Sequence, residues 1–315
     1  MANRGPRQRR NAEEDEIPGL TQRLARLVQH HVFRPHVLLV LAVVASGFVA
    51  LPRVMRLIPD LRERGEYQVA AQDIEIVPSP PDWIPADFID QALRDSGNSD
   101  SVFMLDNSVN EMMAKAFAAH PWVEKVVRVE RAVPARIVVE LEFRRPVAMV
   151  QVKQGLYPVD AQGLLLPPDG FSSGDVRRYP LIQGVLSTPH GPAGTAWGDV
   201  TVVGAARLAD VLSSAWQELE LQAIVAPRLE RADVDIEGLA YELTTPGGTR
   251  IIWGRAPGSN NPGELAAAQK IGRLQKYRSD FGGFDRQHGP YEIDIRHWQE
   301  IMWRPLASNR DGEQH

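Results

Sequence analysis

Residues 116–150, AFAAHPWVEKVVRVERAVPARIVVELEFRRPVAMV, predict the end of a helix followed by two strands that are joined by a tight turn. Val127 and Val129 alternate with charged residues, and the alternation resumes over 137–143 after a turn at Val133-Pro134-Ala135. Alternation of this kind is typical of strands that are buried on one face. The stretch therefore predicts a β-hairpin with one apolar face and one face in water.

The residues before this hairpin predict a strand and two helices. The segment 73–77, DIEIV, alternates like a short strand. A first helix is expected from Pro85, because proline suits the first turn of a helix. A second helix is expected where Ser108 and Glu111 have the spacing of a capping box. The predicted order is strand, helix, helix, strand, strand, with both helices covering the apolar face of the hairpin.

The chain from 152 to 304 predicts a second domain of mixed strands and helices. One helix is expected over 200–220 and another over 263–282, where apolar residues recur at helical spacing. A hairpin is expected around Pro246-Gly247-Gly248. The predicted fold class is therefore α+β, with a C-terminal mixed sheet. An open sheet has edges that can accept a partner strand.

An uncharged run, residues 35–52, precedes these domains. As a helix it would be about 27 Å long, close to the roughly 30 Å of a bilayer core. The flanking Arg34 and Arg53 can extend their side chains to the interfaces. We predict one transmembrane helix at 35–57. A buried core helix is the alternative, and a cleaved signal peptide fits poorly because the preceding segment is long.

The arginines around this run favour one membrane orientation only weakly. The segment 1–34 contains seven arginines, and four more lie between 53 and 64. The positive-inside rule thus favours a cytoplasmic N-terminus without deciding it. The polar, charge-blocked composition of the first residues predicts a mostly disordered tail.

Composition and motifs exclude several classes of function. A net charge of −5 gives no reason to expect nucleic acid as a partner, and the absence of cysteine excludes disulfides and thiolate metal sites. The eight histidines lack metal-ligand spacings such as HExxH. Nucleophile-elbow, Walker A and dinucleotide-binding motifs are also absent from the sequence. We therefore expect no catalytic residues, no cofactor and no metal.

Taken together, the hairpin and its flanks resemble the POTRA domain of the FtsQ/DivIB family of bacterial cell-division proteins. The residues that carry this resemblance are Pro121, Trp122, Val123, Val126, Val129, Arg131, Pro134, Arg145, Pro146, Val147 and Ala148. Downstream, LYPVDAQGLLL (156–166) is similar to the family's next hairpin, with a turn at Asp160 and Gly163. The segment YEIDIRHWQEIMWRP (291–305) is similar to its terminal strand.

The resemblance implies a single-pass protein of the inner membrane. Its N-terminus would be cytoplasmic and its C-terminal domains extracytoplasmic, at the division septum. The implied parts are a cytoplasmic tail at 1–34, the transmembrane helix at 35–57, a connector at 58–72, the POTRA domain at 73–151, a β domain at 152–305 and a disordered tail at 306–315.

The resemblance also implies a non-enzymatic scaffold of the divisome. Its partners would be FtsB-like and FtsL-like single-span coiled-coil proteins, other septal wall-synthesis proteins and the lipid bilayer. The FtsB-like partner would add a strand to the terminal strand, and Arg296 would pair with a partner carboxylate. The partner-binding residues expected on this basis are Glu292, Asp294, Arg296, His297, Trp298, Ile301 and Trp303.

Two other functions stay open at this point. One is a membrane-anchored cell-envelope enzyme, such as a wall hydrolase, which would need a cleft with perturbed acidic or histidine groups. The other is an export or outer-membrane assembly module, in which POTRA domains usually occur in series before a β-barrel.

Overall fold

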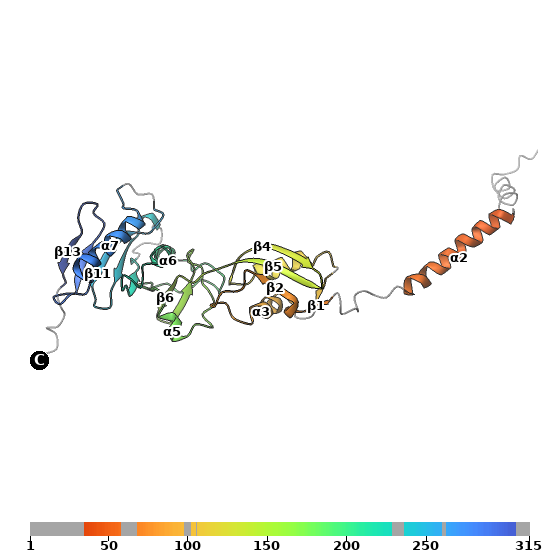
Figure 1. Ribbon diagram of the computed structural model, residues 1–315, viewed down its shortest axis with the longest axis horizontal. Helices are drawn as coiled ribbons and strands as arrows, with labels where there is room; N and C mark the ends of the chain where they lie inside the picture. The colour runs from red at the N-terminus through yellow and green to blue at the C-terminus, as the bar shows by residue number, and fades with distance from the viewer. Residues whose placement is uncertain are drawn as a thin grey trace, which may run out of the picture. The chain divides into compact units, whose positions relative to one another are not determined.

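The computed structural model describes residues 35–57, 68–97, 102–104, 106–228, 236–259 and 263–306. Its contacts divide the chain into two compact units, Met1–Arg64 and Gly65–His315. The predicted tail at 1–34, most of the connector and nearly all of the C-terminal tail lie outside the described residues. The described elements form a mixed α+β fold, as expected (Figure 1).

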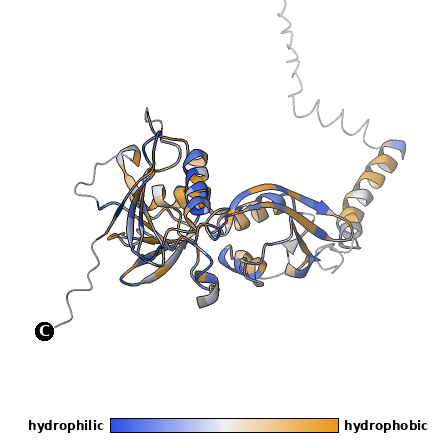
Figure 2. Cartoon of the chain, turned by 60° about the vertical axis from the view of Figure 1, so that its left-hand side comes forward, coloured by the Kyte–Doolittle hydropathy of each residue, from blue (hydrophilic) through white to orange (hydrophobic). Residues whose placement is uncertain are grey.

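In the first unit, helix α2 (Pro35–Leu57) has the bounds that were expected for the membrane segment. Its described apolar side chains are exposed, and Figure 2 shows hydrophobic positions along much of the helix. The side chains at 37–38, 41 and 53–57 are outside the description. Among the residues that are described, no helix is both long and apolar enough to cross a membrane. The membrane crossing therefore stays a prediction from the sequence.

The second unit begins with a three-stranded sheet in the order β2-β5-β4. The strands are β2 (Ile74–Val77), β4 (Val123–Ala132) and β5 (Arg136–Phe143). β5 pairs antiparallel with β4 across the predicted turn and parallel with β2. A short separate ladder joins β1 (Gln68–Val69) to β3 (Val102–Phe103), and a 3-10 turn, η3 (Ala71–Asp73), precedes β2.

Two helices cover this sheet, as expected. They are α3 (Phe88–Asp95), which begins three residues later than predicted, and α4 (Val109–Ala118). The predicted order of strand, helix, helix, strand and strand is thus observed. The apolar core shared by the helices and the sheet includes Phe88, Leu93, Val109, Met113, Phe117, Ile137, Val139 and Leu141.

The inward positions on β4 differ from the prediction. Val127 was expected on the apolar face, yet it is exposed, and the inward residues are Val123, Val126 and Val129. Two irregularities in the pairing with β5 explain the difference, because each bulge adds one residue and shifts the alternation. A strict period of two therefore fails on this strand.

The predicted capping box at the start of α4 is also wrong. The Ser108 side chain makes no capping bond to the helix; its hydroxyl donates to Asp106 Oδ1 at 2.9 Å. The Ser108 N–H donates to the same oxygen at 3.1 Å. Glu111 pairs with Lys115 instead. Asp106 accepts both the N–H and the hydroxyl of Ser108, because an aspartate side chain readily accepts a hydrogen bond from the backbone N–H two residues later.

The second sheet contains eight of the described strands, in the order β13-β12-β11-β10-β9-β8-β6-β7. The hairpin expected around Pro246–Gly248 is confirmed as β10 and β11. The strands are β6 (Ala148–Val152), β7 (Gly155–Val159), β8 (Leu181–Gln183), β9 (Ala223–Val225), β10 (Ala240–Thr244), β11 (Arg250–Arg255), β12 (Tyr291–Asp294) and β13 (Met302–Pro305).

Two main helices share an apolar core with this sheet. α6 (Val200–Leu212) begins at a cap in which Asp199 Oδ1 accepts the Thr201 N–H, but it ends eight residues before the predicted limit of 220. α7 (Ala267–Phe281) lies within its predicted range and ends at Gly282, whose φ of 75° is left-handed. Short turns form α5 (Ser173–Val176) and η4 (Ile236–Gly238).

Near the predicted domain boundary, the chain contributes to both sheets and to both cores. β6 belongs to the second sheet, although 151 was expected to be the last residue of the first domain. Conversely, Leu166 is buried in the core of the first sheet. The predicted turn at Asp160 and Gly163 is present, with the Gly163 N–H bonded to the Asp160 carbonyl at 3.0 Å. The segment after β7 therefore reaches back to the first core.

Candidate functional site

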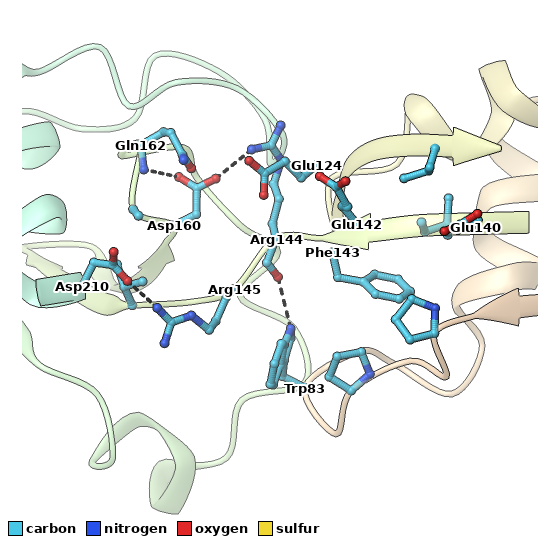
Figure 3. Close-up of a pocket in the computed structure, with 16 residues that line it drawn as sticks. Trp83, Glu124, Glu140, Glu142, Phe143, Arg144, Arg145, Asp160, Gln162 and Asp210 are labelled. Carbon is cyan, nitrogen blue, oxygen red and sulfur yellow. Dashed lines mark hydrogen bonds and ion pairs between the residues drawn. The ribbon is translucent and has the colours of Figure 1, made fainter. Parts of the chain in front are cut away.

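A cavity of about 710 Å³ lies at the junction of the two sheets (Figure 3). Trp83 and Phe143 give it apolar walls, and the Trp83 indole N–H donates to the Arg144 carbonyl at 3.1 Å. Arg144 and Arg145 project from the end of β5 toward the second sheet. Its acidic lining residues are Glu124, Glu140, Glu142, Asp160 and Asp210.

The charges in this cavity are largely satisfied within the protein. Arg144 pairs with the buried Asp160, and Arg145 pairs with Asp210. Glu140 pairs with Arg128 at 3.3 Å, outside the cavity lining. The ion pairs of Arg144 and Arg145 join the residues that follow β5 to the turn after β7 and to α6.

The other candidate is the C-terminal edge of the second sheet. The sequence predicted one partner-binding strand around 292–303. The structure has two strands there, and β12 is an interior strand between β11 and β13. Glu292 and Asp294 therefore do not lie on the edge. β13, at Met302–Pro305, forms the edge.

The main chain of β13 has a defined inner and outer side. Arg304 lies opposite Glu292, and the Leu306 N–H donates to the Pro290 carbonyl at 2.7 Å. In an antiparallel pair, every second residue exchanges hydrogen bonds with its partner. Arg304 and Met302 thus bond inward to β12, whereas the N–H and C=O of Trp303 point away from the sheet. These two main-chain groups of Trp303 are the hydrogen-bond donor and acceptor that are available to an added strand.

Glu292 is a structural residue of the sheet. Its side chain is nearly buried and pairs with Arg250 on β11 and with Arg304 on β13. Those guanidinium groups, Arg250 first, hold the pKa of the Glu292 carboxyl below its usual value. The carboxylate links three neighbouring strands and is not free to bind a partner.

Arg296 was expected to bind a carboxylate from a partner, and the structure gives it an internal one. Its Nε donates to both oxygens of Asp294, at 3.0 and 3.2 Å, and its Nη2 donates to Oδ2 at 2.7 Å. The side chain turns back because the two residues are two positions apart and share one face after β12. The pairing of Arg296 with a partner carboxylate stays a prediction, and such a partner would have to compete with Asp294.

The remaining predicted residues lie between β12 and β13 or on β13. Trp298 is 74% exposed. The His297 carbonyl accepts a hydrogen bond from Arg273 of α7. Ile301 is partly buried against the core of the second sheet. Trp303 is half exposed, and its ring packs edge-on against Tyr291 with centroids 5.7 Å apart.

Sequence reasoning missed a group of residues beside Trp303. The guanidinium of Arg286 lies among the rings of Tyr277, Phe281, Tyr291 and Trp303. Tyr277 and Phe281, four residues apart on α7, were a visible signal because such residues share a helix face. No pattern around Arg286 indicated its place, since it follows the helix in a turn. We name these five residues the Arg286 cluster.

The residues of the hairpin motif have structural positions. Trp122 is buried and lies 6.1 Å from the Phe171 ring, centroid to centroid. Val123 begins β4, and Pro134 lies in the turn before β5. Arg145 forms the ion pair with Asp210, and Pro146 separates β5 from β6. Pro121 is the residue that a side chain on Gly194 would contact.

The comparisons with known proteins give no assignment. No family model matches the chain, and no curated protein matches it. In the described part of the chain, no group of three or more metal-ligating side chains comes together.

Proposed function

We propose that this protein is a non-enzymatic, membrane-anchored scaffold of the bacterial divisome, of the FtsQ/DivIB type. Its first sheet and helices would be the POTRA domain, and the second sheet would be the partner-binding domain. The proposal rests on the sequence resemblance and on one structural observation. β13 is an edge strand whose outward main-chain groups, at Trp303, have no strand beside them in the described chain.

The mechanism is addition of a partner strand to β13. Hydrogen bonds to the Trp303 backbone would supply affinity, and the half-exposed Trp303 ring would supply side-chain selectivity. Aromatic side chains at interfaces bury a large area at a small cost in conformational entropy. The FtsB-like and FtsL-like proteins expected as partners would provide the added strand.

The experiment that tests this proposal is affinity purification of the full-length protein from solubilised bacterial membranes, with mass spectrometry of the bound proteins. Ile301 lies two residues before Trp303, so its N–H is on the same outward side of the strand. Ile301→Pro removes this N–H, and Ile301→Val keeps it. We expect small single-span coiled-coil proteins to be recovered with the parent protein and with Ile301→Val. We expect them to be lost with Ile301→Pro. Equal recovery with a folded Ile301→Pro protein would refute strand addition.

Membrane anchorage at α2 is a separate part of the proposal. It is supported by the uncharged sequence of 35–52 and by the exposed apolar side chains of the helix. The exposed residues are Leu39, Val40, Val43, Val44, Phe48, Val49 and Leu51. Membrane fractionation tests it: the full chain should resist carbonate extraction, and a chain that begins at Gly65 should not.

A further inference from the structure

Arg286 is held at the edge of the second sheet by aromatic rings. Its Cζ lies 4.7 Å from the Phe281 ring centroid and 5.1 Å from that of Trp303. The Tyr291 and Tyr277 centroids are 5.0 and 5.5 Å away. Cations are attracted to aromatic faces, more strongly where water is excluded. The rings therefore fix the position of this guanidinium.

The hydrogen-bonding capacity of Arg286 is largely unused. Its Nη2 donates to the Tyr277 hydroxyl, and its Nε is buried without an acceptor. No carboxylate of the described residues forms an ion pair with it. A guanidinium has five N–H donors in a planar fork that fits a carboxylate. The buried Nε is closed to another molecule, so a carboxylate from a partner would bind the remaining Nη donors.

A second cation lies along the same edge. Arg273, also on the α7 side, donates to the His297 carbonyl and has no carboxylate partner in the described chain. On β12, Glu292 and Asp294 already pair with Arg250, Arg304 and Arg296. Arg273 and Arg286 are thus two arginines near this edge that have no carboxylate partner among the described residues.

The geometry of strand addition brings a partner side chain to this place. Trp303 lies opposite the buried Ile293, so its ring is on the core face of the sheet, the face that also carries Tyr291. An added strand would run about 4.8 Å from β13. Its residue opposite Trp303, and those two positions away, would project on the same face. A glutamate or aspartate there reaches the Arg286 cluster.

We infer that the segment added to β13 is an acidic strand, whose carboxylate on the Trp303 face forms an ion pair with Arg286. This inference rests on the proposed function, because it specifies the partner of the same edge. A second copy of this chain is a poorer occupant. Two copies paired antiparallel through β13 would bring two Arg286 groups together, and like charges across an interface are costly.

A photo-crosslinking experiment tests the inference on the full-length protein in its own membranes. Met302 lies opposite Asp294 and is exposed, so p-benzoylphenylalanine at this position samples the added strand without altering the Arg286 cluster. The captured peptide is then sequenced. We expect an extended segment with Asp or Glu at a position that alternates into register with Trp303.

Charge exchange gives the decisive comparison. Arg286→Glu should reduce the captured partner by about tenfold, and replacing the partner's acidic residue with Arg should restore capture. Arg207 is exposed on α6. The substitution Arg207→Glu makes the same change in net charge and should not change the amount of captured partner. Near-ultraviolet circular dichroism and thermal melting check that each variant is folded.

The outcomes separate the two ideas. Capture of a segment without an acidic residue, or equal capture by Arg286→Glu, overturns the acidic-strand inference and leaves strand addition standing. Failure of Arg286→Glu to be rescued by the exchanged partner also overturns it. Capture of a second copy of this chain, or no capture at Met302, overturns both the inference and strand addition at β13.

Discussion

Arg144, just after β5, and Asp160, in the turn after β7, form an ion pair with 2.8 Å between Nη1 and Oδ2. Both side chains are largely buried, and Asp160 Oδ1 also accepts the N–H groups of Gln162 and Leu164 at 3.0 and 2.9 Å. One carboxylate therefore organises the turn and joins it to the residue that directly follows the first sheet's hairpin. The contact explains how the two sheets are held at their junction.

Replacement of Asp160 by alanine should lower the free energy of unfolding by about 3 kcal/mol, because it leaves a largely buried guanidinium and two backbone N–H groups without their acceptor. Urea denaturation of the chain from Gly65 onward measures this loss. Arg145→Ala breaks the more exposed pair with Asp210 and should cost less than about 1 kcal/mol. Equal effects of the two substitutions would contradict this account of the junction.

Gly204 on α6 is required by close packing against Tyr241. A Cβ at this position would lie 2.0 Å from the Tyr241 hydroxyl, which donates to the Thr201 carbonyl at 3.1 Å. Gly204→Ala should therefore destabilise the protein by about 1–3 kcal/mol, although alanine is the better helix former.

The double variant Gly204→Ala with Tyr241→Phe makes this prediction sharper. Removing the hydroxyl removes the closest contact, while the ring carbon Cζ would still lie 2.6 Å from the Cβ. The clash is relieved in part, so the double variant should be more stable than the sum of the two single changes predicts. Thermal unfolding of the four proteins measures the coupling. Additive effects would show that the clash is absorbed elsewhere.

His120 should make stability dependent on pH. Burial lowers the pKa of its imidazole, and the nearby Asp95 and Asp87 oppose that shift only in part. Nδ1 accepts the Trp122 N–H at 3.3 Å, and the ring packs edge-on against Phe88. The native state thus favours the neutral ring.

Because the folded pKa is below the unfolded one, the contribution of His120 is present above about pH 6.5 and is lost as the pH falls through the folded value. The unfolding free energy should therefore decrease between about pH 7 and pH 5. His120→Gln should flatten this part of the profile in urea titrations at a series of pH values. An unchanged slope in the variant would assign the dependence to other groups.

Lys270 is a buried cation with two acceptors from other parts of the fold. Only 1% of the residue is exposed; Nζ donates to the Trp253 carbonyl at 2.8 Å and pairs with Glu264. Burial lowers the pKa of Lys270, and Glu264 opposes that shift. Lys270→Met should cost about 3 kcal/mol, because Glu264 loses its counter-charge.

Adding Glu264→Gln to Lys270→Met should recover much of this loss, since no carboxylate is then left without a cation. Chemical denaturation of the parent, the single variant and the double variant distinguishes the ion pair from simple packing. If the double variant is less stable than Lys270→Met, the pair is not the source of the effect.

Local pattern predicted the elements well where one face of an element is buried. The hairpin of β4 and β5, the hairpin of β10 and β11, and helix α7 were all expected from periodicity. The inward residues of β4 were not, since two bulges shift the alternation. Lys270 on α7 was missed as a core residue, because its burial depends on an acceptor at Trp253 on a different element.

The sequence by itself determined the element order and the α+β class, because alternation and helical spacing record which side chains neighbour one another along one strand or helix. It also contained the resemblance on which the proposed function depends. Only the tertiary structure decided that β12 is interior and β13 the edge, that Arg296 is paired internally, and that Arg286 lies beside Trp303. These facts join residues on different elements, and the burial and pairing that create them exist only after the chain has packed.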